Sequence, residues 1–335
     1  MMTEFLLAYG LFLAKVVTGL IAAVILVGLI AGARRPEDPS ELKVTHLNQK
    51  YSDLKKRLQQ ATLSKKAFKE QQKSAAKDAK ADSKAKASDS ETRPNLYVLE
   101  FDGDIKATEV DSLRDEITGV LSVVAEGDEV FLKLDNSGGI VHEHGLAASQ
   151  LKRITDAGVP LTVAVDKVAA SGGYMMACVA NTILAAPFAI IGSIGVVAQL
   201  PNFNRLLDKA GIDFEQHTAG KYKRTVTMFG KNTPKERAKL KQELEETHVL
   251  FQEFVTTNRP ELDLSKVATG EHWYGSQALE LGLVDELITS DQFITNAVEK
   301  FEVYQVEIEF KKGLQDRLMG GFLGAIEALR GSVRP

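Results

Sequence analysis

The stretch that decides the fold runs from Val168 to Val179 and reads V-A-A-S-G-G-Y-M-M-A-C-V. Two small residues, one serine and two glycines lead directly into an apolar run. This pattern predicts a sharp turn from a strand into a buried helix, with the hydroxyl of Ser171 at the helix N-terminus. The backbone N–H groups at such an end are unpaired and favour negative charge. Ser171 is therefore either an N-cap or a nucleophile whose oxyanion has donors nearby.

Alternating strands and helices surround this stretch. Apolar spacing predicts strands over 96–101, 129–134 and 161–165. It predicts helices over 108–124, 141–157, 234–257, 273–283 and 291–301. The alternation of strands and helices of this length indicates βαβ units with right-handed crossovers. The sequence therefore predicts an α/β fold with parallel sheets and flanking helices.

No charged residue stands between Lys167 and Arg205, so hydropathy alone would propose a membrane span there. Glycine, proline and polar residues such as Pro187 and Gly192 divide the stretch into short pieces. Short apolar pieces are typical of strands and helices that are buried on all sides, and we expect a buried core. Cys178 lies in this stretch and is expected to pack in the core.

The N-terminal segment from Phe5 to Ala33 is apolar except for Lys15 and Thr18, and two arginines and a proline follow it. Its length is sufficient to span a bilayer, and no small-x-small cleavage site precedes the arginines. We expect a retained, single-pass transmembrane anchor over residues 5–33, in contact with membrane lipid.

From Glu41 to Arg93 the composition changes to Lys, Ala, Ser, Gln and Asp, with a weak helical stripe of leucines. We expect a charged stalk over 41–93 that is helical at first and disordered towards its end. Its basic run is interpreted as a solvated tether, although it could also lie on anionic lipid headgroups. The folded domain is expected over 94–302, and a C-terminal tail over 303–335 has no functional interpretation.

The net charge of −4 gives no reason to expect nucleic acid as a partner. A single cysteine excludes an intrachain disulfide and lacks the neighbours that a metal site would need. We therefore expect neither a metal nor another cofactor.

The second predicted strand ends in Asp135-Asn136-Ser137-Gly138-Gly139. Paired glycines at the carboxyl end of a parallel strand mark the crevice where α/β sheets bind ligands. They also let backbone N–H groups approach a substrate closely, as an oxyanion hole requires. His142 and His144 open the next helix; they could line the crevice, but we interpret them as polar surface positions.

A serine nucleophile needs a base, and no pair of histidine and aspartate follows Ser171 at a suggestive distance. A lysine can serve when burial lowers its pKa. The candidates are Lys221 and Lys223 in A-G-K-Y-K-R-T at 219–225. The residues alone leave open which lysine acts, and a solvated surface charge is the ordinary interpretation of either.

Several motifs in order resemble the signal peptide peptidase A family of serine–lysine peptidases, which have a ClpP/crotonase-like fold. They are A-A-S-G-G-Y at 169–174, G-S-I-G-V at 192–196, G-K-Y-K at 220–223 and G-S-Q-A-L-E-L-G-L-V-D-E at 275–286. The resemblance covers roughly residues 96–299. The anchor, stalk and single peptidase domain are most similar to a membrane-anchored branch of that family.

The resemblance implies a role for each matching residue. Ser171 would be the nucleophile and Lys223 the general base, with Lys221 as its competitor. Ser193 would hydrogen-bond and orient the lysine amine. The oxyanion hole would consist of the backbone N–H groups of Gly139 and Ser171. This family usually has proline where Ser137 stands, so the loop lacks the fixed φ of proline but keeps its backbone donors.

The resemblance also implies peptide substrates and a homo-oligomer. In short members of the family the protomers form a ring or dome, and the serine and lysine of one site come from neighbouring chains. Related peptidases keep their domain outside the cytoplasm, whereas Arg34 and Arg35 would place it inside under the positive-inside rule. We expect the periplasmic side of a bacterial inner membrane.

The expected function is that of a serine endopeptidase that cleaves apolar peptides, such as signal-peptide remnants, through an acyl-enzyme. Two alternatives stay open. A crotonase-type acyl-CoA enzyme shares the fold and uses glycine-rich oxyanion holes, but it needs neither Ser171 nor Lys223. A non-catalytic membrane scaffold would not need these residues either, and the intact Ser171, Ser193 and Lys223 argue against it.

Overall fold

The computed structural model describes residue 5 and residues 7–20, 40–74 and 93–310 of the 335-residue chain. The contacts divide the chain into two units, which are residues 1–42 with 309–335 and residues 43–308. In the first unit, residues 7–20 are helical and exposed. Over the described ranges, no helix combines the length and the apolar character that crossing a bilayer requires. The predicted anchor over 5–33 lies partly outside the described residues.

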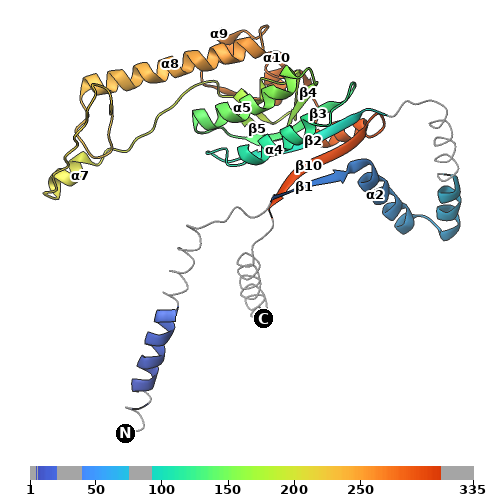
Figure 1. Ribbon diagram of the computed structural model, residues 1–335, viewed down its shortest axis with the longest axis horizontal. Helices are drawn as coiled ribbons and strands as arrows, with labels where there is room; N and C mark the ends of the chain where they lie inside the picture. Colours follow the sequence, from blue (N-terminus) through green and yellow to red (C-terminus); the bar gives the residue numbers. More distant parts are fainter. Residues whose placement is uncertain (1–4, 6, 21–39, 75–92, 311–335) are drawn as a thin grey trace. The chain divides into compact units, whose positions relative to one another are not determined.

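One sheet organises the second unit, and Figure 1 labels the strands of its main path from β1 to β4. The strand order is β1 (Ser40–His46), β10 (Glu302–Phe310), β2 (Asn95–Gly103), β3 (Glu129–Asn136), β4 (Leu161–Val165), β6 (Thr182–Ala185) and β9 (Glu286–Leu287). A branch beside β3 consists of β5 (Val168–Ala170), β7 (Ile190–Gly192) and β8 (His272–Tyr274). The pairings from β10 to β9 and those of β5 are parallel, and β7 pairs with β8 in antiparallel fashion. The predicted parallel α/β sheet is confirmed.

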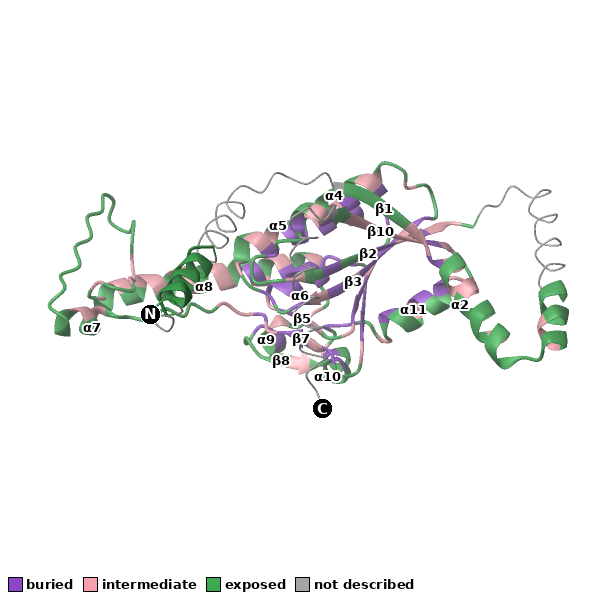
Figure 2. Ribbon diagram, turned by 90° about the horizontal axis from the view of Figure 1, so that it is seen from below, coloured by how far each residue is buried: buried purple, intermediate pink, exposed green. Residues whose placement is uncertain are grey.

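Helices cover both faces of the sheet (Figure 2). One face carries α4 (Val110–Leu121), α5 (Val141–Asp156) and α6 (Gly172–Ala177). The other face carries α2 (Leu47–Thr62) and α11 (Ser290–Ala297). Further helices are α7 (Asn204–Lys209), α8 (Pro234–Asn258), α9 (Leu264–Val267) and α10 (Gly275–Glu280), and residues 65–74 are also helical.

The central strands feed both cores because successive side chains point to opposite faces. In β2, Leu99 and Phe101 belong to the core under α4 to α6, whereas Leu96 and Val98 belong to the core under α11. Phe131 of β3 also points to the second core. Strands buried on both faces read as continuous apolar runs, as parallel strands do.

The uncharged stretch after Lys167 contributes to the centre of the first core as far as Ile194, as expected. The expectation is wrong for Phe188 and for residues 197–203, which are exposed. All six residues of α6 are buried, and Tyr174 and Met176 are fully excluded from solvent. Cys178 is also fully buried, and burial raises the pKa of its thiol to about 12. The thiol therefore stays protonated and packs as a small apolar group, as the sequence predicts.

The structure differs from the predicted elements at both ends of the domain. All of α2 and all but the first residue of β1 lie within the range 41–93 assigned to a stalk, and β10 extends into the range 303–335 assigned to a tail. Asn48 joins the two regions: its Nδ2 donates to Phe301 O at 2.9 Å, and its Oδ1 accepts from Val303 N at 2.7 Å. These partners are far apart in the sequence, so local spacing gives no sign of them.

A smaller difference concerns the helix predicted over 273–283. Trp273 and Tyr274 lie in β8, opposite Ile191 and Ile190 of β7, and the helix α10 begins at Gly275. The apolar spacing of these two aromatic residues is compatible with a helix. They are in a strand instead, because they pair with β7.

Glu116 is a buried carboxylate of α4 that contacts β10. It is 5% exposed on α4, and its Oε1 accepts from Ile308 N at 2.9 Å. Burial raises the pKa of Glu116 to about 7; the hydrogen bond from Ile308 opposes this rise, and the charges of Glu109 and Glu307 add to it. The carboxylate is thus a group whose ionisation destabilises the fold.

We expect the stability of the fold to depend on pH through Glu116. Because its folded-state pKa is raised, the folded protein binds more protons than the unfolded chain between pH 4.5 and about 7, and it loses stability as the pH rises through this interval. Glu116→Gln keeps an acceptor for Ile308 and avoids the charge. The free energy of unfolding of Glu116→Gln should exceed that of wild type by up to about 3 kcal/mol near pH 8, and the difference should be much smaller near pH 4.5.

Thermal unfolding of both proteins at the two pH values measures this difference. The control is Glu126→Gln, which changes an exposed carboxylate and should unfold like wild type at both. A gain for Glu116→Gln that is equal at both pH values would show that ionisation of Glu116 is not the cause.

Candidate active site

The site lies where β3, β5 and β7 end side by side (Figure 2). Asn136 of β3 is in register with Ala169 of β5, and Ala170 is in register with Gly192 of β7. The turns that follow these three strands therefore leave the sheet together, at the carboxyl ends where α/β sheets bind ligands.

Ser171 connects β5 to α6 in a strained conformation. Its φ is 54° and its ψ is −117°, which a residue other than glycine adopts at a cost of roughly 1–3 kcal/mol. The surroundings enforce it: Ser171 N donates to Gly192 O at 2.7 Å, and Met175 N donates to Ser171 O at 3.0 Å. The side chain makes no capping hydrogen bond to α6. The N-cap interpretation is therefore wrong, and the half-buried hydroxyl is left for another use.

The glycine pair after β3 packs against this turn. A Cβ on Gly138 would lie 2.7 Å from Ser171 Cβ, and φ of Gly138 is 84°. A Cβ on Gly139 would lie 2.1 Å from Ile105 O. Both positions therefore require glycine, and the loop lies within van der Waals distance of Ser171.

Free backbone donors surround Ser171. Gly138 N is occupied, because it donates to Asn136 Oδ1 at 2.6 Å. Over residues 93–310, the N–H groups of Gly139 and Gly172 make no hydrogen bond, whereas that of Ser171 donates to Gly192 O. This finding counts against the N–H of Ser171 as an oxyanion donor and favours that of Gly172.

Ser193 follows β7 in a second strained turn. Its φ is 52°, and its N–H donates to Glu271 O at 2.7 Å. The preceding Gly192 packs under the ring of Trp273, which lies 2.8 Å from where a Cβ would stand. Since Gly192 O also accepts from Ser171 N, the turns that carry the two serines are linked by a direct hydrogen bond.

The candidate lysines lie elsewhere. Lys221 and Lys223 are exposed in a segment without helix or strand between α7 and α8. We call residues 198–233 the arm; Figure 1 shows α7 and the arm beside the first half of α8 and away from the sheet. The arm is held by its own contacts, such as Phe203 N to Met228 O at 2.7 Å.

Two contacts made by α8 show how far the lysine segment of the arm lies from the two serines. Lys239 Nζ lies 5.5 Å from the ring of Tyr222 in the arm, and nine residues later His248 Nε2 lies 3.2 Å from Ile194 O, beside Ser193. Nine helical residues span about 13 Å. Within the described chain, no hydrogen bond joins Lys221 or Lys223 to either serine. One chain thus brings together the two serines and the glycine loop but not the lysine.

The two histidines near the crevice differ from each other. His142 is exposed, as expected, whereas His144 is fully buried, so the interpretation of His144 as a surface position is wrong. His144 lies three, four and seven residues before Ala147, Ala148 and Leu151, which places it on the buried face of α5. This spacing is visible in the sequence and could have predicted the burial of His144.

Comparisons with known proteins identify a family. The chain matches Peptidase family S49 over residues 153–304 and the N-terminal part of that family over residues 4–151. "Probable protease SohB" of Haemophilus influenzae is 47% identical, covering 94% of this chain and 92% of the relative. "Probable protease SohB" of Buchnera aphidicola subsp. Schlechtendalia chinensis is 46% identical, covering 87% of this chain and 99% of the relative.

Solved structures show weaker likenesses. The 1510-N membrane-bound stomatin-specific protease is 14% identical, with a TM-score of 0.40 over 66% of this chain and 96% of the other. An enoyl-CoA hydratase/isomerase family member is 15% identical, with a TM-score of 0.32 over 60% of this chain and 70% of the other. Likenesses at these TM-scores support no conclusion about activity.

We expect Gly138 and Gly145 to respond to alanine in opposite ways. Gly138→Ala places a Cβ against the backbone at Ala170 O in a left-handed conformation, so it should unfold at lower denaturant concentration and displace the loop. Gly145 lies within α5 with no atom within 4 Å of its Cβ position, so Gly145→Ala should stabilise the fold by about 1 kcal/mol. Urea unfolding measures both, and a neutral Gly138→Ala would contradict the packing described here.

Proposed function

Since the chain belongs to peptidase family S49, we propose that it is a membrane-anchored serine endopeptidase with Ser171 as nucleophile and Lys223 as general base. Its similarity to proteases named SohB supports a peptidase and gives no support to the acyl-CoA alternative. The observation that carries the proposal is the strained Ser171, whose hydroxyl caps no helix and lies beside free backbone donors.

The proposed chemistry follows from these positions. Ser171 Oγ attacks a peptide carbonyl while the neutral amine of Lys223 takes its proton. The N–H groups of Gly139 and Gly172 then hold the tetrahedral oxyanion, each contributing about 3 kcal/mol to the transition state. Lys223 returns the proton to the leaving amine, Ser193 orients the lysine, and water hydrolyses the acyl-enzyme.

We propose that the lysine of each site comes from a neighbouring copy of the chain. The arm that carries Lys223 exposes large apolar side chains, which in soluble proteins mark interaction sites. They include Leu200, Phe203, Leu206, Ile212, Phe214, Met228 and Phe229. Docking of the arm on a second copy would bury these side chains and desolvate Lys223, which favours the neutral amine.

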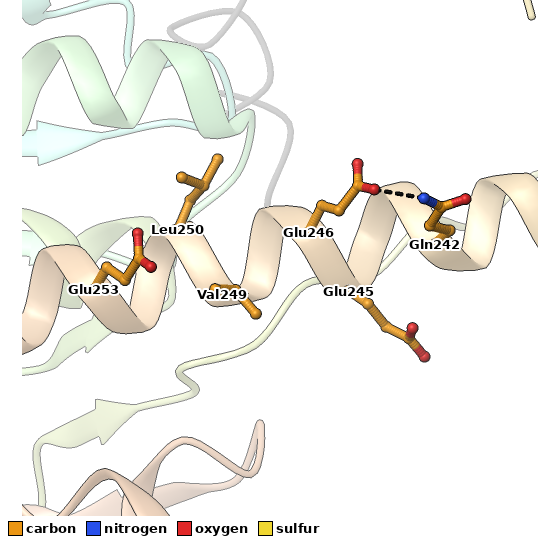
Figure 3. Close-up of a pocket in the computed structure, with 6 residues that line it drawn as sticks. All are labelled: Gln242, Glu245, Glu246, Val249, Leu250 and Glu253. Carbon is orange, nitrogen blue, oxygen red and sulfur yellow. Dashed lines mark hydrogen bonds between the residues drawn. The ribbon is translucent and has the colours of Figure 1, made fainter.

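A face of α8 provides a second surface for such an assembly. Val249 and Leu250 are 50% and 64% exposed, and they project among Glu245, Glu246 and Glu253 around a shallow hollow (Figure 3). Apolar side chains with a rim of carboxylates suit contact with a partially basic protein surface, and the arm also carries the exposed Lys209, Arg224 and Lys231. We propose that copies associate through the arm and this face.

The membrane anchor and the substrates belong to the same proposal. The apolar sequence over 5–33 supports a single-pass anchor in a bacterial inner membrane. The resemblance to peptidases that keep their domain outside the cytoplasm supports the periplasmic side, against the positive-inside rule. The uncharged surroundings of Ser171 support apolar peptides, such as signal-peptide remnants, as substrates. A non-catalytic scaffold remains the alternative against which activity is tested.

We expect two of three alanine variants to lose activity. With detergent-solubilised full-length protein and a fluorogenic apolar peptide, Ser171→Ala and Lys223→Ala should abolish turnover, because each removes one reacting group. Lys221→Ala should retain it and serves as the matched control. Loss with Lys221→Ala instead of Lys223→Ala would mean that the base is misassigned. Unchanged turnover by Ser171→Ala would favour the scaffold.

We also expect two inactive variants to restore activity together. Co-expressed Ser171→Ala and Lys223→Ala chains should form mixed assemblies in which intact serine and lysine meet across a junction. Turnover should return to a substantial fraction of wild type, on the order of a quarter. Each variant alone, at the same total concentration, is the control. If mixed assemblies form and stay inactive, serine and lysine of one site belong to the same chain.

A further inference from the structure

Two buried polar side chains lie beneath the glycine loop of the site. Asn136, at the end of β3, is 1% exposed, and His144 on α5 is fully buried. Asn136 Oδ1 accepts from Gly138 N at 2.6 Å and lies 3.1 Å from His144 Nε2. One oxygen therefore connects the histidine ring to the peptide group that precedes the free N–H of Gly139.

The arrangement fixes the direction of these hydrogen bonds. Gly138 N is a donor, so the atom of Asn136 that faces it is the carbonyl oxygen, and His144 Nε2 must then donate to the same oxygen. His144 Nδ1 lies 2.9 Å from Ile140 O. A neutral imidazole carries one N–H, so a ring that donates from Nε2 has no proton to donate from Nδ1 to Ile140 O. The hydrogen bond from Nε2 to Asn136 Oδ1 is therefore the one that orients the ring, and rotation of the ring would break it.

The same pair packs against the first residues of α6. A Cβ on Gly172 would lie 2.4 Å from His144 Cγ, and a Cβ on Gly173 would lie 2.2 Å from Asn136 O. Asn136 and His144 therefore contact both segments that supply the proposed oxyanion donors, the loop with Gly139 and the turn with Gly172.

The position of Asn136 leaves one of its polar atoms without a hydrogen bond. Its Nδ2 is buried and has no hydrogen-bond partner in the described part of the chain. A Cβ on Gly103 would lie 2.0 Å from this nitrogen, so the backbone closes over it. A buried donor without a partner destabilises a fold. Stability alone therefore does not explain why an asparagine stands here. The two contacts of its Oδ1, to Gly138 N and His144 Nε2, offer a reason.

We propose that His144 is a positioning residue of the oxyanion hole, acting through Asn136. His144 holds the amide of Asn136, Asn136 holds Gly138 N, and the loop is thereby fixed with the N–H of Gly139 directed at the oxyanion formed on Ser171. The inference rests on the proposed function and adds a residue that touches neither substrate nor reacting atoms.

The test uses pairs of variants that keep or remove one hydrogen bond. His144→Gln keeps a donor at the same number of bonds from the backbone as Nε2, and His144→Leu removes it. Asn136→Asp keeps the acceptor for Gly138 N, and Asn136→Leu removes it. His142→Leu changes the exposed histidine two residues earlier and is the matched control.

The readout is kcat and KM for the fluorogenic peptide, with thermal unfolding of each protein. His144→Leu and Asn136→Leu should lower kcat by about 100-fold, the scale of one lost oxyanion donor, with KM little changed. His144→Gln and Asn136→Asp should recover most of kcat, and His142→Leu should match wild type. Affinity for a peptide boronic acid, which forms a tetrahedral adduct, should fall in parallel with kcat.

Several outcomes would overturn the inference. One is wild-type kcat in a folded His144→Leu protein. Another is a folded His144→Gln protein whose kcat is about 100-fold below that of wild type, and this variant decides the matter even if the leucine variants do not fold. A loss confined to KM would assign His144 to substrate binding instead. The proposed function fails separately, if Ser171→Ala turns over the peptide like wild type.

Discussion

The hydrogen bond from Ser171 N to Gly192 O is the contact on which the rest of the site depends. It joins β5 to β7 at their carboxyl ends and holds Ser171 at a positive φ. The same bond places the next residue, Ser193, beside the first serine. Strain of this kind persists only where the surroundings enforce it. Here the enforcing element is α6, a helix buried on every side that fixes where the turn must end.

Glycine and buried polar groups transmit this constraint to the neighbouring loop. Gly138, Gly139 and Gly172 are in contact with backbone or ring atoms at distances that leave no room for a Cβ. Asn136 and His144 fill the space below them and direct their polar atoms at the loop. A close-packed layer of this kind holds backbone N–H groups in place before a substrate arrives, which is the condition for electrostatic stabilisation of an oxyanion.

The long helix α8 divides the molecule into a fixed part and an exposed part. At the C-terminal end of α8, Arg259 donates two hydrogen bonds to the carboxylate of Asp285. Burial by itself would raise the pKa of Asp285, but the hydrogen bonds and the charge of Arg259 outweigh burial and lower this pKa. Phe251 and Val255 are buried in the core. The N-terminal half carries the arm with Lys223 instead. The proposed nucleophile and base thus belong to parts with different environments, and in the proposed mechanism a neighbouring copy supplies the surface that buries the lysine.

The sequence by itself determined the parallel α/β core, the burial of Cys178 and the serine at the start of α6. These features depend on residues two to four positions apart, whose spacing is visible locally. The buried side of His144 was visible in the same way but was misinterpreted. Only the tertiary structure decided that β1 and β10 belong to the sheet, that Ser171 N is occupied by Gly192 O, and that Lys223 lies away from Ser171. Such contacts join residues far apart in the chain, and their geometry depends on how the whole core packs.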